Sequence, residues 1–180
     1  MDSATVAKGS FLALSLPVIL SACQRSQQAL EQGAGFRVFE ADEVADLSAI
    51  AARIIPTDDT PGATEAGVIY FLDTIFAEAR RASQLALLRE GLAALRGQLT
   101  TGGRHIHELT EAQQDQLLRD NEQTPFFATM RYLTIAGTFS LPRYGGNRDK
   151  VGYQLIGYED RGAWSAPYGF YDADYAERGE

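Results

Sequence analysis

Apolar residues recur every three or four positions along several stretches between residues 40 and 140, which is the spacing of one face of an α-helix. The first stretch runs from Glu40 to Ile54, has acidic residues in its early turns, and is stopped by Pro56. Strand-like alternation of useful length is absent from the sequence. The pattern predicts an all-α fold, an irregular bundle of about five or six helices.

Two further helices follow from the same spacing. One is expected from about Ala63 to Arg81, with an apolar stripe along one side. Ser83 is expected to cap the next helix, which carries a leucine every three or four residues as far as Leu99. Such stripes are typical of core packing.

The last two predicted helices have stronger start signals. Thr110 and Gln113 have the spacing of a capping box at the head of one helix. Thr124 and Pro125 give an N-cap and a proline at the first helical position of the other. This last helix is apolar on most sides, so we expect it to be central or covered by a partner. Gly137 is expected to loosen its end.

Composition narrows the class of protein. The 180 residues are 45% hydrophobic and 22% charged, which is ordinary for a soluble globular domain. The net charge of −8 argues against a nucleic-acid partner, because a phosphate backbone demands an excess of basic side chains. The single cysteine, Cys23, excludes an internal disulfide and a thiolate metal cluster.

Cys23 follows an apolar run from Phe11 to Ala22, too short to span a bilayer but suited to an export signal. The sequence from Leu20 to Cys23 resembles a bacterial lipobox, which makes Cys23 a candidate lipidation site. An ordinary signal peptide cut nearby and a frayed helix are the alternatives. We expect residues 1–22 to be an export signal and 23–35 a flexible tether.

Catalytic and metal-binding patterns are weak. His105 and His107 form an HxH pair, but a metal would need a third ligand, and Glu108 and Glu111 nearby are ordinary helix-start residues. A surface loop is the favoured interpretation. Asp58 and its neighbours are expected to form a capped turn and not a cation site. The chain has no GxGxxG fingerprint and no nucleophile elbow, so we predict no catalytic, metal or cofactor-binding residues.

The segment from Pro142 to Tyr158 has the composition of a recognition loop, with two adjacent glycines among aromatic and basic residues. We expect residues 36–158 to form the helical domain and 159–180 an aromatic-rich, irregular tail. Aromatic residues at that density favour a tail that packs on its own domain or on another protein. The candidate partner contacts are Arg143, Tyr144, Gly145, Gly146, Asn147, Arg148, Tyr153, Trp164, Tyr168, Phe170 and Tyr171.

These features together resemble a known family. The motifs IIPTDDTPGA at residues 54–63 and PRYGGNRDKVGYQLIGY at residues 142–158, with the capped helix near Thr110, are similar to the gluconate 2-dehydrogenase subunit 3 family. The resemblance covers residues of about 40 to 158. Lys8 and Gly9 stand where the twin-arginine export signal of that family would have its two arginines.

The resemblance implies a non-catalytic small subunit in a periplasmic, membrane-associated complex. Its partner would be a flavoprotein of the glucose-methanol-choline oxidoreductase type that carries FAD and oxidises a sugar, sugar acid or glucoside. A cytochrome c subunit with haem commonly completes such complexes. The small subunit would support export, maturation and stability of the flavoprotein. The alternative is a free-standing periplasmic lipoprotein that binds a small ligand or an envelope protein.

Overall fold

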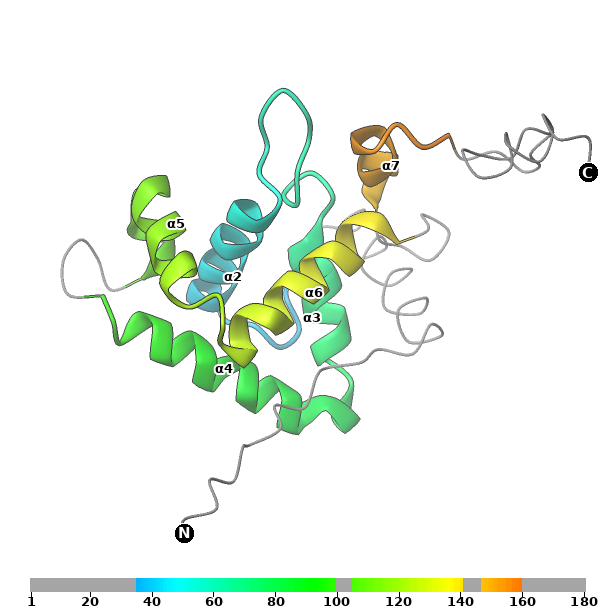
Figure 1. Ribbon diagram of the computed structural model, residues 1–180. Coiled ribbons are helices and arrows are strands. Elements are labelled where there is room, and N and C mark those ends of the chain that lie inside the picture. Colours follow the sequence, from blue (N-terminus) through cyan, green and yellow to red (C-terminus); the bar gives the residue numbers. More distant parts are fainter. Residues whose placement is uncertain (1–34, 100–104, 141–146, 160–180) are drawn as a thin grey trace, which may run out of the picture.

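The computed structural model describes residues 35–99, 105–140 and 147–159, and within them the chain is helical with no β-strand. The prediction of an all-α bundle is confirmed (Figure 1). The aromatic tail and Cys23 lie outside the described residues. The α-helices are α2 (Ala41–Ile54), α3 (Val68–Phe76), α4 (Ala82–Arg96), α5 (Glu111–Asp120), α6 (Pro125–Phe139) and α7 (Val151–Leu155), and the short 3-10 segments are η1 (Ala79–Arg81), η2 (Ile106–Glu108) and η4 (Arg148–Lys150).

Helix α6 is the centre of the bundle, as its apolar composition predicted. It packs against α2, α3, α4 and α7, and its Met130 and Leu133 are completely buried (Figure 1). Gly137 does not loosen the helix end, because α6 continues to Phe139. A Cβ at Gly137 would lie 3.0 Å from Cδ1 of Phe71, so the glycine allows α3 to approach α6 closely.

The predicted helix boundaries are right where a cap signal is present and wrong elsewhere. Thr110 and Thr124 both accept the expected capping hydrogen bond. Ser83, by contrast, lies inside α4, which begins one residue earlier and has no side-chain cap. The helix predicted from Ala63 is shorter than expected, because Gly67 takes a left-handed conformation with φ of 71° and α3 begins only after it.

The loop at residues 54–63 folds back on itself. The Glu65 carboxylate accepts hydrogen bonds from the Gly62 N–H at 2.8 Å and from the Thr57 hydroxyl at 2.7 Å, and these bonds hold the pKa of Glu65 below its usual value. A Cβ at Gly62 would lie 2.5 Å from backbone atoms of Ile55 and Pro56, so only glycine fits there. The glycine of this motif is therefore explained by the tight turn that the backbone makes there.

The expected capped turn within this loop is confirmed. One carboxylate oxygen of Asp58 accepts hydrogen bonds from the backbone N–H and the hydroxyl of Thr60, both at 2.8 Å. These bonds lower the pKa of the exposed Asp58 carboxyl.

A buried carboxylate attaches the segment before α2 to α3. Asp73 is 5% exposed and accepts hydrogen bonds from three consecutive backbone N–H groups, those of Arg37, Val38 and Phe39, at 2.9 to 3.3 Å. Each of these amides precedes the helix and has no helical partner, so Asp73 satisfies donors that burial would otherwise leave unpaired. No helix among the described segments combines the length and apolar character that a bilayer crossing requires.

Candidate functional site

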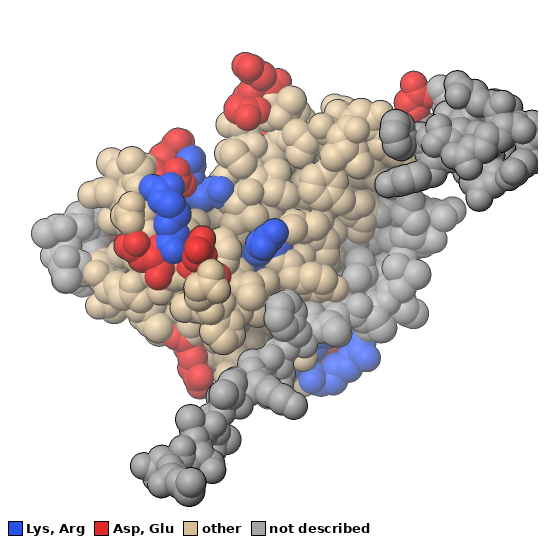
Figure 2. All heavy atoms as spheres, viewed as in Figure 1, with Lys and Arg blue, Asp and Glu red and all other residues tan. Residues whose placement is uncertain are grey.

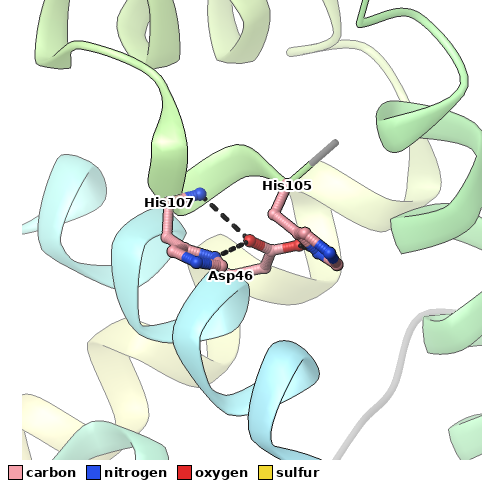
Figure 3. A group of neighbouring side chains, drawn as sticks. All are labelled: Asp46, His105 and His107. Atoms are coloured by element: carbon pink, nitrogen blue, oxygen red, sulfur yellow. Dashed lines mark hydrogen bonds and ion pairs between the residues drawn. The ribbon is translucent and has the colours of Figure 1, made fainter. Parts of the chain in front are cut away.

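A cluster of one carboxylate and two imidazoles joins α2 to η2 in the described residues. Asp46 comes from α2, and His105 and His107 come from the segment around η2 (Figure 3). The Asp46 carboxylate lies between the two imidazole rings and is completely buried, whereas the rings are partly exposed. One ligating atom from each of the three residues lies within 4.8 Å of the others.

Asp46 is held by donors on both oxygens. Its Oδ1 accepts the backbone N–H of His107 at 3.0 Å and lies 2.6 Å from the Nδ1 of the same residue. Its Oδ2 accepts a hydrogen bond from the Nε of Arg96 on α4 at 2.6 Å. Burial acts to raise the pKa of Asp46, but the bonds from His107 and Arg96 outweigh burial and hold the pKa below its usual value. Asp46 is therefore an anion inside the domain.

His105 is the member of the cluster with an unused nitrogen. Its Nδ1 is buried and has no hydrogen-bond partner among the described residues; the Oδ2 of Asp46 is 3.6 Å away, beyond hydrogen-bond range. Its Nε2 lies 3.6 Å from the Oδ2 of Asp42. The centroids of the two imidazole rings are 5.4 Å apart. A buried ring nitrogen without a partner is rare enough to require a reason.

The local sequence explains why both rings face α2. Ile106 between them is 1% exposed and is anchored in the core, while its carbonyl accepts a hydrogen bond from the Gln114 side chain. The Glu108 carboxylate accepts the backbone N–H of His105 at 3.1 Å at the start of η2. With Ile106 and Glu108 fixed, the two histidines are placed on the same carboxylate.

The sequence-based interpretation of the histidines as a surface loop is incomplete. The two acidic residues that follow the histidines have other roles, since Glu108 accepts the backbone N–H of His105 and Glu111 pairs with Arg53 at 2.8 Å. The third acidic residue is Asp46, which lies 61 positions before His107 in the chain. Asp46 carries only the signal of an acidic residue early in a helix, so its partnership with the histidines could not be inferred from sequence.

The candidate partner contacts are described only in part. Asn147 is completely buried, and its side-chain oxygen accepts the backbone N–H of Gly152, so its side chain belongs to the packing of the domain. Tyr153 is also buried, at 6% exposure, whereas Arg148 is exposed. The remaining candidates, at positions 143–146 and 164–171, lie outside the described residues, and their role stays a prediction.

A hollow of about 610 Å³ lies on the surface among α2, α5 and α6. Both apolar and charged side chains line it. Ile135 on α6 belongs to it and is 42% exposed. Figure 2 shows that charged side chains gather at the α5 end of the molecule, while the face over α6 toward α7 carries few. The lining residues are Arg53, Ile54, Ile55, Asp115, Leu118, Arg119, Glu122, Phe127, Arg131, Ile135 and Phe139.

Comparison with known proteins gives one match. The family model described as gluconate 2-dehydrogenase subunit 3 matches residues 41–160, which include all of the described helices. No curated protein and no solved structure matches the chain.

Proposed function

This chain belongs to the gluconate 2-dehydrogenase subunit 3 family, and we propose that it is the non-catalytic small subunit of a periplasmic, membrane-associated, FAD-dependent sugar dehydrogenase complex. Its role in that complex is to support the export, maturation and stability of the catalytic flavoprotein. The observation that carries the proposal is the family match over residues 41–160, which makes the chain a subunit of a multi-subunit dehydrogenase.

The fold supports a role without cofactor chemistry in this chain. Dinucleotide cofactors bind at the carboxyl edge of a parallel sheet, beside a glycine-rich turn. The described residues form no strand, and the sequence lacks the GxGxxG spacing. FAD in the partner subunit and haem in a cytochrome c subunit fit this arrangement, with oxidation of the sugar, sugar acid or glucoside in the flavoprotein.

The hollow among α2, α5 and α6 supports docking of the catalytic subunit. Protein interfaces have an apolar centre and a polar rim in which arginine is enriched. The hollow combines apolar side chains, among them Phe127, Ile135 and Phe139, with three arginines. The adjoining face over α6 carries few charges (Figure 2), so a partner could cover it without desolvating unpaired ions.

Co-expression tests the role in maturation. A glucose-methanol-choline type flavoprotein from the same source is expressed with and without this chain, and exported dehydrogenase activity and bound FAD are measured. We expect exported activity to fall by about 10-fold or more without the small subunit. Equal yields of exported, FAD-loaded enzyme in both cases would contradict the proposal and would favour a free-standing lipoprotein.

A pair of surface variants tests the docking face in the same assay. Ile135→Asp places a charge in the hollow and should reduce recovery of the complex, because a buried unpaired charge is costly at an interface. Leu87→Asp is the matched control, since Leu87 is 60% exposed on α4 and does not line this hollow. Equal losses in both variants would show that the α6 hollow is not the docking face.

A further inference from the structure

We propose that Asp46, His105 and His107 form a binding site for a borderline divalent transition metal of the zinc class. The site is independent of the flavoprotein and would hold the segment around η2 against α2. It is built from one carboxylate oxygen and two imidazole nitrogens, a ligand set that zinc accepts in proteins with a water as the fourth ligand.

The geometry is close to that of a three-ligand site. In a tetrahedral zinc site, metal–ligand distances near 2.1 Å place neighbouring ligands about 3.4 Å apart. The Nδ1 of His107 lies 2.6 Å from the Oδ1 of Asp46, and the Nδ1 of His105 lies 3.6 Å from its Oδ2, so the two rings face different oxygens of one carboxylate. One ligating atom from each residue lies within 4.8 Å of the others, so the rings would have to rotate for one oxygen and two nitrogens to reach coordination distance.

The unpaired nitrogen of His105 is the observation that points to a ligand. If the cluster only joined two elements, each buried nitrogen would be expected to have a hydrogen-bond partner. His107 and Arg96 each bond to one oxygen of Asp46, whereas the Nδ1 of His105 has no partner among the described residues although it faces the same carboxylate. A metal ion would give this nitrogen its missing partner.

The charges around the cluster favour a cation. Three carboxylates, those of Asp42, Asp46 and Glu108, contact the two histidine residues, and Arg96 is the one guanidinium bonded to Asp46 in the described structure. Arg96 bonds Oδ2 and leaves Oδ1 to face His107. In the metal-bound state, Arg96 would orient the ligating carboxylate, as outer-shell donors do at metal sites.

The protons balance without any further reactant. Asp46 is ionised and can only accept, so the neutral His107 ring carries its proton on Nδ1. Coordination through Nδ1 shifts that proton to Nε2 by exchange with solvent, and the ring stays neutral. Where a ring is protonated beforehand, metal binding releases one proton to solvent.

Calorimetric titration with Zn²⁺ tests the site. The full-length chain is purified without a histidine tag, stripped with a chelator and titrated near neutral pH. His105 and His107 are the only histidines in the chain, so no other imidazole can contribute to zinc binding. We expect saturable binding of one Zn²⁺ per chain and a rise in melting temperature when the metal is added.

His105→Phe is the decisive variant. The buried nitrogen of the His105 ring makes no hydrogen bond to any described residue, so an aromatic ring of similar size should keep the melting temperature of the metal-free chain within about 2 °C. Zinc affinity should fall by more than about 10-fold, because one ligand is lost. Glu111→Gln, which removes an 81% exposed carboxylate outside the cluster, should leave zinc affinity unchanged.

Two results would overturn the proposal. One is the absence of saturable zinc binding to the wild-type chain below about 100 µM. A preformed three-ligand site should have a dissociation constant for zinc below that concentration. The other is equal affinity in His105→Phe and the wild type. Because flavoprotein export is measured separately, neither result bears on the role of the chain in the dehydrogenase complex.

Discussion

Asp46 and Asp73 are both buried carboxylates that tie a preceding or following segment to a helix, but their partners differ. Asp73 accepts only backbone N–H groups, from Arg37, Val38 and Phe39. Asp46 accepts one backbone N–H and faces three side chains that carry nitrogen, two of them imidazoles. Backbone amides cannot coordinate a cation without losing their protons, whereas a neutral imidazole has one ring nitrogen with a free lone pair and can move its proton to the other.

The difference separates a structural clamp from a site with chemical capacity. The donors that bond to Asp73 in the described structure are backbone N–H groups, so no side-chain nitrogen beside it is left to bind a ligand. The cluster around Asp46 has one buried nitrogen, on His105, that the described structure leaves without a hydrogen bond. Burial of a carboxylate is therefore a poor guide to function unless its partners are identified.

The largest expected effect is at Asp46. Asp46→Ala should lower the free energy of unfolding by about 3–5 kcal/mol, because it leaves the Arg96 guanidinium and the His107 N–H without their acceptor inside the domain. Urea unfolding followed by circular dichroism measures the loss. A loss below about 1 kcal/mol would mean that the cluster contributes little to the fold.

Asp73→Asn should have the next largest effect, a loss of about 2–3 kcal/mol. The amide group keeps one acceptor oxygen but turns an NH₂ toward backbone donors that now lack a partner. Hydrogen exchange should accelerate at Arg37 and Val38 and stay slow at His107. Faster exchange at His107 as well would show that the hydrogen bonds of Asp73 and Asp46 are coupled, and the two carboxylates could then not be treated as separate.

Arg96→Gln should lower the free energy of unfolding by about 1–2 kcal/mol, less than removal of Asp46. The Arg96 side chain is 26% exposed, so water can hydrogen-bond to Asp46 in its place. Chemical denaturation measures this cost. Zinc affinity should change by less than about 10-fold, since Arg96 orients the carboxylate without ligating the metal. Complete loss of zinc binding in this variant would show that Arg96 is indispensable to the geometry.

The smallest effect is expected at the surface pair that joins α2 to α5. Arg53 donates to both carboxylate oxygens of Asp115, at 2.7 and 3.1 Å, and this hydrogen bonding, more than the charge alone, lowers the pKa of Asp115. A double-mutant cycle with Arg53→Ala and Asp115→Ala should give a coupling of about 0.5–1 kcal/mol near neutral pH.

The pH dependence of that coupling follows from the direction of the shift. Because the pKa of Asp115 is lower in the folded chain, the stabilisation is present above the unfolded pKa of about 3.9 and is lost as the pH falls through the folded value. The cycle repeated at acidic pH should give a coupling near zero. A coupling that is constant down to pH 2 would exclude the ion pair as its source.

The sequence predicted the fold well wherever a physical signal was local. Thr110 and Thr124 marked helix starts because a cap involves residues only three positions apart. Ser83 failed as a cap because the residues before it form the 3-10 turn η1, and the chain is already helical when it reaches Ser83. The role of Gly137 could not be predicted, because it depends on close approach to Phe71, which lies in another helix.

The candidate site was only half visible in the sequence. The HxH spacing identified His105 and His107, but the third member of the cluster is set by packing of α2 against η2. Periodicity places Asp46 in the first half of a helix and says nothing about which segment will cover it. A carboxylate contributed from so far along the chain is the kind of partner that only a tertiary structure reveals.

The most direct test of the difference between the two buried carboxylates is the absorption spectrum of the Co²⁺-substituted chain. Cobalt replaces zinc, and its visible bands report the number and geometry of its ligands. We predict that the wild type and Asp73→Asn give the same intense bands of a four-coordinate site, and that Asp46→Asn loses them. Bands that persist in Asp46→Asn, or that disappear equally in Asp73→Asn, would contradict the account.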